Sequence, residues 1–481
     1  MHRSQRYSNS YLKVLDTIAY ALLFPWVTAV SLFLACYISN IIEKLYPQKK
    51  LIQYFVLGPF FAALTCLLLP MGVLGALIWI WLCTFTEKEA YSYCIAEEYE
   101  WSEGRKRSSS KCMDDVKDNG HIFTFASANV LLGPDFLNKL NHNTSGFKRC
   151  GKIGEKLTNH NGKYLSNLMV EKKEVGRRDF IFTEFPSVDF LCLQEVWERF
   201  HASVLLNHLS SQYGYFIYDV GEYSFKSNLC LLGSGLMFAS KMPILEAEFK
   251  PFSFRTNHAK FTSLGVLCVK VLLNYCQNGD RHVGIIANLH TQAFQGFDAV
   301  IYSQLSEALE FIENFKEKNL HTGDIVKFDI VCGDFNADNI SPGDEDVQNH
   351  PIFDEYVDPC VEKPGKDKSW SIGTELRQMT LFSPNISTPE LFKEALIDDS
   401  LRRLYVLDAD VVIHRPSLMT AVVQPDWAGR VKPQPYGGMR RVDKIIMHKS
   451  TKTKTLGYGF VTALTHLTDH LPVCMTIQTE Q

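Results

Sequence analysis

The sequence predicts an α/β (α+β) protein in which β-sheets pack on each other with helices outside, preceded by two hydrophobic membrane segments. Many short apolar runs have the length and composition of β-strands, and a few segments show helical spacing instead. Two long runs without charged residues lie near the N-terminus and predict the membrane segments. The 481 residues are 46% hydrophobic and 21% charged, which is a globular composition.

The two N-terminal hydrophobic runs are longer than the roughly 20 apolar residues that a membrane-crossing helix needs. No charged residue occurs within 17–42 or within 51–86. Buried core helices usually keep a polar face, which these runs lack, and neither run resembles a cleaved signal peptide. We therefore expect residues 1–86 to be a membrane anchor, with hydrophobic segments at about 14–42 and 51–86.

Basic residues flank both hydrophobic runs, so the positive-inside rule places every flank on the cytoplasmic side. Prolines also interrupt the runs, at Pro25 and Pro70. Together these features predict two re-entrant segments that enter the membrane and return on the same side. The alternative is a hairpin of two spans, which would place the loop with Lys49 and Lys50 across the membrane. Either arrangement places the C-terminal part of the chain on the side of the N-terminus, facing the cytosol.

Thirteen cysteines are scattered along the chain without a C-x-x-C pair. This pattern is typical of reduced thiols in a cytosol-facing protein rather than of a disulfide framework. Four cysteines in or beside the hydrophobic runs are candidates for S-palmitoylation, with a small buried side chain as the alternative interpretation. These are Cys36, Cys66, Cys83 and Cys94.

The rest of the chain divides by composition. Residues 87–120 are polar and charged and are expected to be a linker, and residues 121–481 carry the β-like runs of one domain. Helical spacing occurs at 195–209 and 303–315. A Lys-rich segment at about 138–178 is expected to be a solvated insert. The alternative is a patch for anionic lipid, because each basic residue near a charged leaflet contributes about 1 kcal/mol.

Polar side chains follow several of the apolar runs at the point where each run ends. If these runs are neighbouring strands whose ends meet at one edge, their polar side chains converge. Each residue alone has an ordinary explanation as a turn, a cap or a buried histidine. Taken together and in this order, they predict a site for a metal or a phosphate. The set is Asn129, Glu195, His290, Asp334, Asn336, Asp443, Asp469 and His470.

Six motifs resemble, in order, those of the deoxyribonuclease-I-like superfamily of metal-dependent phosphodiesterases and phosphatases. They are SANV, LQEVW, NLHTQ, CGDFN, RRVD and TDHLPV. Wider strings such as FLCLQEV, SGLMFAS and FDIVCGDFN, with the hydrophobic segments, resemble the membrane-anchored neutral sphingomyelinase branch. The resemblance covers essentially the whole chain. It implies a four-layer α/β/β/α sandwich of two packed β-sheets, and hydrolysis of sphingomyelin to ceramide and phosphocholine at a membrane surface.

The resemblance implies a Mg²⁺ site, with Mn²⁺ as a substitute. Mg²⁺ is a hard cation that is often held by one or two carboxylates together with substrate phosphate. Glu195 is the expected metal ligand, with Asn129 beside it and Asp469 contributing through water. The set lacks the cysteines and multiple histidines that zinc prefers.

The remaining residues of the set are expected to carry the chemistry. His470 is the expected general base, and Asp443 orients it, because an imidazole titrates near neutral pH and an aspartate stabilises its cation. Asp334 and Asn336 would position the water and the phosphate. His290 would bind a phosphate oxygen and help to protonate the leaving alkoxide. An exchange of the roles of His470 and Asp334 stays open.

Three positions depart from the sphingomyelinase branch. Ala259 and Leu264 stand where the branch carries the Asp and Lys of a short stretch that is thought to act as an activity switch, and Gly233 replaces an Asn. All three lie outside the predicted metal site. They concern regulation and the fit of the headgroup rather than hydrolysis.

The sequence also weighs against several other functions. An endonuclease would favour a basic domain without membrane segments, whereas the formal net charge is -4, so no nucleic acid partner is expected. An inositol-phosphate phosphatase would carry a Trp-Cys-Asp-Arg string where this chain has RRVDKII. Two alternatives stay open: a phospholipase C type phosphodiesterase acting on lysophospholipids, and a non-catalytic membrane scaffold.

The expected substrate is membrane sphingomyelin, and the expected activator is anionic phospholipid. The sequence does not distinguish among the Golgi, the plasma membrane, the endoplasmic reticulum and the mitochondrion.

Overall fold

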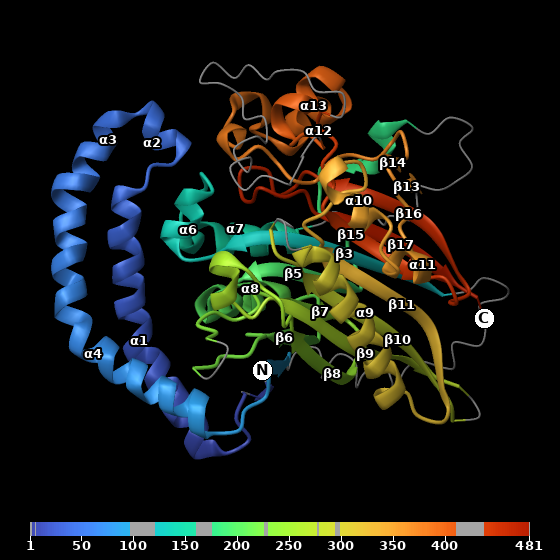
Figure 1. Ribbon diagram of the computed structural model, residues 1–481, viewed down its shortest axis with the longest axis horizontal. Helices are drawn as coiled ribbons and strands as arrows, with labels where there is room; N and C mark the ends of the chain where they lie inside the picture. The colour runs from blue at the N-terminus through green and yellow to red at the C-terminus, as the bar shows by residue number, and fades with distance from the viewer. Residues whose placement is uncertain are drawn as a thin grey trace.

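Two β-sheets face each other across an aromatic core in the computed structural model of the chain (Figure 1). The structure describes residues 2–4, 6–96, 121–159, 176–225, 229–276, 279–293, 299–409 and 437–480. Most of the predicted linker and the second half of the predicted Lys-rich insert therefore lie outside the described residues.

The first sheet has nine strands within the described residues, in the order β1-β2-β6-β7-β5-β3-β17-β16-β4. At its centre β3 (Ile122–Leu132) runs parallel to β5 (Phe190–Val196) and antiparallel to β17 (Val473–Thr479). The outer strands are β1 (His2–Ser4), β2 (Ser92–Ile95), β6 (Tyr215–Tyr218), β7 (Met237–Ser240), β16 (Thr453–Val461) and β4 (Ile181–Phe182).

The second sheet has six strands among the described residues, in the order β12-β15-β11-β10-β9-β8. Its central strands β10 (Arg281–His290) and β11 (Asp324–Asp334) are parallel, and β15 (Asp443–His448) is antiparallel to β11. The other strands are β12 (Tyr356–Val357), β9 (Gly265–Tyr275) and β8 (Ile244–Pro251). A separate small hairpin joins β13 (Val361–Lys363) and β14 (Lys366–Asp367).

The core between the two sheets is built around buried aromatic rings. The ring centroid of Phe125 lies 5.1 Å from that of Phe190 in the same sheet and 5.1 Å from that of Phe328 in the facing sheet. Because all three side chains are fully buried, their apolar area contributes to the stability of the sandwich.

Helices cover the outer faces of both sheets. The first sheet is covered by α7 (Gly146–Thr158) and α8 (Arg199–Leu209), and the second by α9 (Val300–Asn319), α10 (Glu345–Gln348) and α11 (Ile352–Glu355). The predicted four-layer α/β/β/α sandwich is thus confirmed. The shorter helices are α6 (Asp135–Leu140), α12 (Pro389–Ile397) and α13 (Asp399–Tyr405), and the last two lie together at one end of the molecule (Figure 1).

Two segments that were expected to be irregular contain regular structure. The first half of the predicted solvated insert forms α6 and α7, and α7 packs on the first sheet through Cys150, Ile153 and Leu157. These apolar residues recur at helical spacing, but the surrounding lysines obscured the pattern. Within the predicted linker, β2 joins the first sheet by pairing with β6. The prediction of irregular structure was wrong for these two segments.

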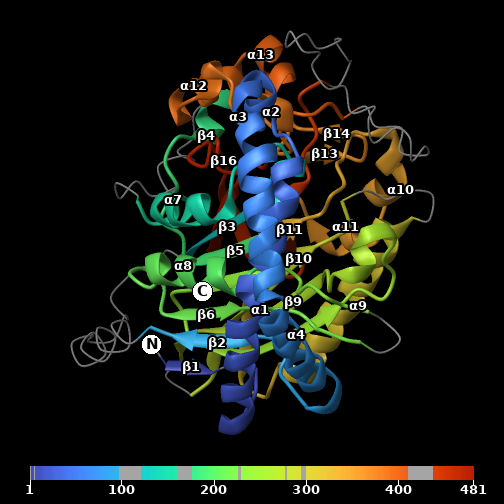
Figure 2. The same ribbon diagram turned by 90° about the vertical axis from the view of Figure 1, so that its left-hand side faces the viewer.

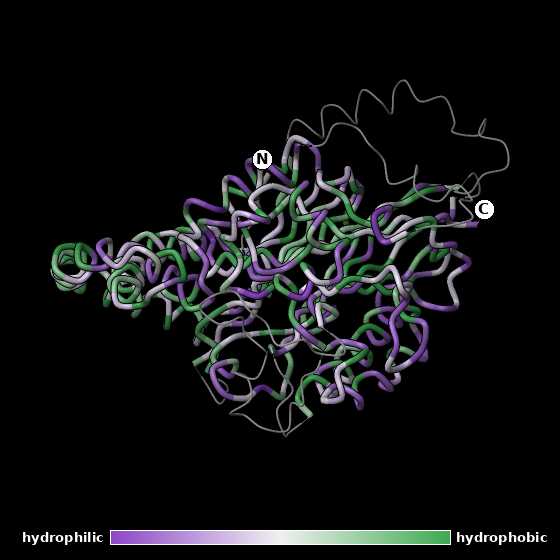
Figure 3. Tube along the Cα trace, turned by 90° about the horizontal axis from the view of Figure 1, so that it is seen from above, coloured by the Kyte–Doolittle hydropathy of each residue, from purple (hydrophilic) through white to green (hydrophobic). Residues whose placement is uncertain are grey.

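The N-terminal hydrophobic runs form a helical hairpin outside the sandwich. It consists of α1 (Ser10–Tyr37) and the antiparallel α4 (Gly58–Phe85), joined by α2 (Ile41–Leu45), α3 (Pro47–Ile52) and a π-helical turn (Gln53–Leu57). Figure 3 shows the hairpin projecting from the sandwich, with the hydrophobic colour prevailing along its two helices. Both helices are long and apolar enough to cross a membrane, by length and composition.

Both ends of the hairpin contact the sandwich through polar groups. At its base, Asp16 pairs with Arg199, whose guanidinium also pairs with Asp219. At its tip, Glu43 pairs with Lys139 of α6 at 2.7 Å and with Lys50 at 3.3 Å. The hairpin therefore lies along one side of the sandwich, as Figure 2 shows.

The geometry bears on both predicted membrane arrangements without a membrane being present. Each hydrophobic run is one helix that continues through Pro25 or Pro70, so the turn that a re-entrant segment requires is absent from α1 and α4. A two-span hairpin would carry Lys50 across a membrane, whereas Lys50 lies beside Glu43 and the Glu43–Lys139 pair at the sandwich. The placement of the hairpin in a membrane stays a prediction.

Candidate active site

Three residues of the predicted site lie side by side on the second sheet. Strand register pairs His290 with Asp334, and Asp334 with Asp443. Because side chains of directly paired residues point to the same face, these three groups form a row across adjacent strands. The His290 Nε2 atom lies 3.7 Å from Asp334 Oδ2.

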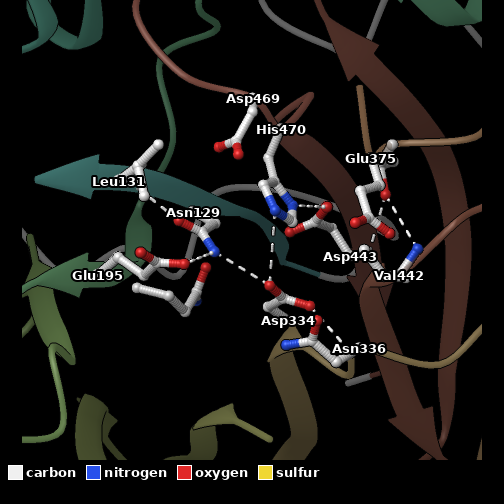
Figure 4. A network of polar contacts seen from close by, with 12 residues as sticks. Asn129, Leu131, Glu195, Asp334, Asn336, Glu375, Val442, Asp443, Asp469 and His470 are labelled. Atoms are coloured by element: carbon white, nitrogen blue, oxygen red, sulfur yellow. Dashed lines mark hydrogen bonds and ion pairs between the residues drawn. The ribbon is translucent and has the colours of Figure 1, made fainter. Parts of the chain in front are cut away.

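Two further residues reach this row from the first sheet. The side-chain amide of Asn129, on β3, donates a 2.7 Å hydrogen bond to Glu195 Oε1 and a 3.0 Å hydrogen bond to Asp334 Oδ2. Its Oδ1 accepts from the backbone N–H of Leu131 at 3.1 Å. Asn129 therefore links the two carboxylates, and through them the two sheets (Figure 4).

Glu195 has a backbone conformation that is unusual for a residue with a side chain. Its φ is 61°, in the left-handed region that few non-glycine residues adopt. Gly235, with φ 75°, packs against it, and a Cβ at this glycine would lie 3.0 Å from Glu195 Cα. The indole N–H of Trp197 donates to Glu195 Oε2 at 3.3 Å. Strained backbone of this kind is frequent at functional sites.

The described residues include two groups of ligand atoms that could hold a metal ion, each with all atoms within 4.8 Å of one another. One consists of Glu195, His290 and Asp334, and the other of Asp334, Asp443 and His470. The first group supplies two carboxylates and has Asn129 beside it, which suits a hard divalent cation such as Mg²⁺. The residues therefore fit a metal of this class at the first group.

His470 and Asp443 form a buried dyad. The Nδ1 atom of His470 lies 2.9 Å from Asp443 Oδ2, whereas its Nε2 atom lies 3.8 Å from Asp334 Oδ2. Burial disfavours the charged ring, but Asp443 and Asp334 outweigh burial and raise the pKa of His470 well above its ordinary value. Burial raises the pKa of Asp443. The ring is thus oriented through Nδ1 and can accept a proton at Nε2.

Asp334 is held as a carboxylate. Burial alone would raise its pKa, but His470, His290 and the amide of Asn129 together lower it. Its Oδ1 accepts a 2.9 Å hydrogen bond from the backbone N–H of Asn336. The Asn336 side chain donates to the Thr291 carbonyl at 2.9 Å. His290 Nδ1 is buried and has no hydrogen-bond partner among the described residues.

Asp469 lies at the edge of the site and belongs to neither ligand group. Its Oδ2 accepts a 2.9 Å hydrogen bond from the Gln378 side chain. Its Oδ1 is buried and has no partner within the part of the chain that the structure describes. Figure 4 shows Asp469 beside His470, away from Glu195. A direct metal contact from Asp469 is therefore not part of this arrangement.

Sequence reasoning missed several residues that hold the site together. The Thr374 hydroxyl accepts from the backbone N–H groups of Val442 and Asp443, both at 3.0 Å. Glu375 forms a β-bridge with His470 and pairs with Arg440 at 2.6 Å. Thr374 and Glu375 lie in a stretch that resembled neither a strand nor a helix. No periodic signal could have identified them.

The structure also bears on the candidate lipidation sites and the three departures. Cys66 is exposed, Cys83 is partly exposed, and Cys36 and Cys94 are buried; S-palmitoylation of any of them stays a prediction. Ala259 and Leu264 are both buried in the core beneath α9. A Cβ at Gly233 would lie 2.9 Å from the Val220 carbonyl oxygen, which explains the absence of a side chain there.

The chain is similar to known proteins over much of its length. The model of the endonuclease/exonuclease/phosphatase family matches residues 140–463. Among curated proteins, sphingomyelin phosphodiesterase 5 of Danio rerio is 35% identical over 295 residues, which cover 60% of this chain and 52% of that protein. Sphingomyelin phosphodiesterase 3 of Homo sapiens is 32% identical over 339 residues, which cover 66% of this chain and 50% of that protein.

A third relative matches along nearly its full length. Sphingomyelin phosphodiesterase 5 of Mus musculus is 27% identical over 485 residues, which cover 99% of this chain and 94% of that protein. The chain spans about half the length of the other two relatives. The family match includes Glu195, His290, Asp334 and Asp443 but ends before His470 and begins after Asn129.

Proposed function

Since the chain belongs to the endonuclease/exonuclease/phosphatase family, we propose that it is a Mg²⁺-dependent phosphodiesterase that hydrolyses sphingomyelin to ceramide and phosphocholine at a membrane surface. The observation that carries the proposal is the match to curated sphingomyelin phosphodiesterases, one of them over 99% of this chain. The converging carboxylates and histidines supply the groups that such a reaction requires.

The metal would be held by Glu195 and Asp334, the two carboxylates of the first group of ligand atoms. When bound, Mg²⁺ would neutralise negative charge on the phosphate. Asn129 would fix the spacing of the two carboxylates, because one amide group donates to both. Mn²⁺ is proposed as a substitute, since carboxylate and amide groups also suit it.

We assign the role of general base to His470. Asp334 would stay negatively charged and act as a carboxylate. Asp443 raises the pKa of His470, and the histidines lower the pKa of Asp334. Asp443 orients the ring and stabilises the imidazolium that forms when the ring takes a proton. The Asp443–Nδ1 contact leaves Nε2 of His470 to take the proton from an attacking water.

The remaining groups would bind the phosphate and assist the leaving oxygen. His290 Nε2 faces Asp334 on the other side from His470 and would donate to the leaving oxygen or to a phosphate oxygen. Asn336 would hold Asp334 through its backbone N–H. Gln378, which donates to Asp469, would keep this carboxylate at the edge of the site, where it reaches the metal through water.

The same proposal includes the membrane and an anionic phospholipid activator. Lys148, Lys152 and Lys156 are exposed and spaced four residues apart on α7, so they form one basic stripe. Figure 2 shows α7 beside the hairpin. Lysines near an anionic leaflet each contribute about 1 kcal/mol of attraction. The sandwich would face the cytosol.

Phosphocholine release from purified full-length protein tests the proposal. The protein is assayed in detergent micelles with an anionic phospholipid, on sphingomyelin, lysophosphatidylcholine and phosphatidylcholine, with Mg²⁺ or EDTA. We expect release from sphingomyelin that EDTA abolishes, and that His470→Ala lowers by about 10²–10⁴ in kcat, the usual contribution of a general base. Glu195→Ala should abolish it as well, and a titration of Mg²⁺ should show weaker metal binding.

The matched control is His321→Ala, which removes an exposed histidine just before β11, at the opposite end of that strand from Asp334. Equal activity of wild type and His470→Ala would contradict the mechanism. Preference for lysophosphatidylcholine would change the substrate while leaving the reaction class intact. Absence of release from all three lipids would favour the non-catalytic scaffold.

A further inference from the structure

A cavity of about 680 Å³ lies between the hairpin and the sandwich. Its apolar lining comes from both α1 and α4 and from two loops of the sandwich. The side chains are Leu32, Ala35, Leu57, Phe61, Phe382 and Leu467. Cavities of roughly 300–1,000 Å³ with a mainly apolar lining and a few polar groups are the usual binding sites for small molecules.

The cavity adjoins the candidate active site. His466 and Leu467 line it, and the same loop carries Asp469 and His470 into the site. Arg149 lines the cavity from the sandwich side, and its guanidinium donates to the backbone carbonyls of Val130 and Leu131, beside Asn129. The cavity therefore shares the 466–470 loop with the site and lies next to the strand end that carries Asn129.

The hairpin lies on the side of the sandwich where β3 ends near the candidate active site. Helix α6 follows β3 in the chain, and α1 packs against α6. The end of β3 that carries Asn129 thus faces the hairpin, and Figure 2 shows the hairpin crossing in front of the sandwich on this side. The hairpin therefore lies next to the strand end that leads into the site.

We propose that this cavity binds the hydrocarbon chains of the lipid whose phosphodiester is cleaved, so that the hairpin forms part of the substrate site. The inference rests on the proposed function and adds a site that selects substrates by the length of their hydrocarbon chains. The apolar part of the lining would shield the chains from water, and the polar part would lie toward the headgroup. The loop of His466 and Leu467 then joins the chain-binding cavity to the general base.

The charged residues that line the cavity are suited to contact lipid headgroups. Lys148 and Lys152 are exposed residues of the lining, Lys139 is engaged by Glu43, and Asp135 and Arg149 also line the cavity. Exposed lysines at an apolar opening can meet the phosphates of neighbouring lipids while the chains lie deeper. A separate anionic phospholipid held in the cavity would use the same lysines, and the test below distinguishes it from the substrate.

Two substitutions of opposite sense test the chain-binding role. Leu32→Trp narrows the cavity from α1, and Phe61→Ala widens it from α4. KM and kcat are measured with hexanoyl, palmitoyl and lignoceroyl sphingomyelin in mixed micelles at fixed anionic lipid. We expect Leu32→Trp to raise KM for the two longer substrates relative to the hexanoyl one by about tenfold, the scale of pocket discrimination, with kcat changing less. Phe61→Ala should shift the preference toward the longest chain.

Matched controls carry the same chemical changes outside the cavity. Leu34→Trp lies on α1 with 40% of the Leu34 side chain exposed, and Phe55→Ala removes a side chain that is 76% exposed. Both should keep the wild-type order of chain preference. If active wild type and both cavity variants show the same order, the inference is overturned. If instead the variants change the requirement for anionic lipid without changing chain preference, the occupant is a separate lipid and the inference is also overturned.

A second measurement needs neither activity nor a variant. A sphingomyelin with a photoactivatable group in its acyl chain is crosslinked to the wild-type protein, and the modified peptides are identified by mass spectrometry. Labelling of α1 and α4 together with the loop of Leu467 supports the inference. Labelling confined to the outer surface of the hairpin overturns it. Sphingomyelin that labels the cavity but is not hydrolysed would contradict the proposed function alone.

Discussion

The hairpin and the sandwich core are built from the same kinds of apolar residue but use them in opposite ways. Phe125, Phe190 and Phe328 are fully buried between the sheets, whereas Phe55 and Phe60 on the hairpin are 76% and 58% exposed. The sandwich is therefore stabilised by apolar burial within the protein. The hairpin contacts the sandwich through the ion pairs at its base and tip and through aromatic rings, such as Phe24 against Phe147 and Phe200. Much of its apolar surface is exposed.

The largest expected contrast comes from removing one ring from each region. Phe328→Ala should lower the free energy of unfolding of the sandwich by about 4 kcal/mol, because truncating a buried phenylalanine loses its burial and leaves a cavity. The ring of Phe328 fills the space where a Cβ of residue 284 would lie, so its removal leaves an empty space against Gly284 as well. Phe55→Ala should change the same quantity by less than about 0.5 kcal/mol. Chemical denaturation followed by tryptophan fluorescence measures both, and equal effects would remove the distinction between the regions.

A smaller effect is expected at the base of the hairpin. Asp16→Ala removes a carboxylate that pairs with Arg199 at 2.7 Å, with Asp16 8% and Arg199 24% exposed. Arg199 keeps Asp219 as a partner, so the expected cost is about 1–3 kcal/mol, below that of a fully isolated buried charge. Hydrogen exchange should quicken in α1 while β11 stays protected.

The control for this change is Val14→Ala, on the same helix with 56% of the side chain exposed. It should leave exchange in α1 as in wild type. Equally fast exchange in β11 after Asp16→Ala would show that the hairpin and the sandwich unfold as one unit.

The smallest effect is expected at an exposed ion pair of the sandwich. Arg178 and Glu394 lie 2.6 Å apart, but their side chains are 59% and 55% exposed. Solvent and salt screen such a pair, which typically contributes less than about 1 kcal/mol. Arg178→Ala should shift the thermal midpoint only slightly, and a larger shift would mean that this surface contributes to stability in a way the geometry does not show.

The convergence of the candidate site could be predicted because each residue marks the end of an apolar strand. His290, Asp334 and Asp443 end or begin neighbouring strands, and the register brings them into one row. The pairing order itself could not be predicted, because β10 and β11 are parallel while β15 is antiparallel and reached only after a long excursion. Thr374 and Gln378 belong to that excursion, and their roles depend on tertiary contacts.

The fold followed from the same strand signals, and the errors have physical causes. Helix α7 was overlooked because only its buried face is apolar, while lysines occupy the exposed positions. Strand β2 has just four residues and is stabilised by pairing with β6, which lies more than 100 residues away in the chain. The direction of the hairpin tip depends on Glu43 and Lys139, and no local pattern identifies that contact.

The row of His290, Asp334 and Asp443 also limits which insertions and deletions the gene can tolerate. Side chains on a strand alternate between faces, so a one-residue deletion within β11 would turn Asp334 away from its neighbours unless a bulge absorbed it. Insertions and deletions in this strand should therefore be inherited rarely, whereas the loops that leave the sheet can vary in length. Substitution, rather than a change of length, is the route by which the chemistry of this site can evolve.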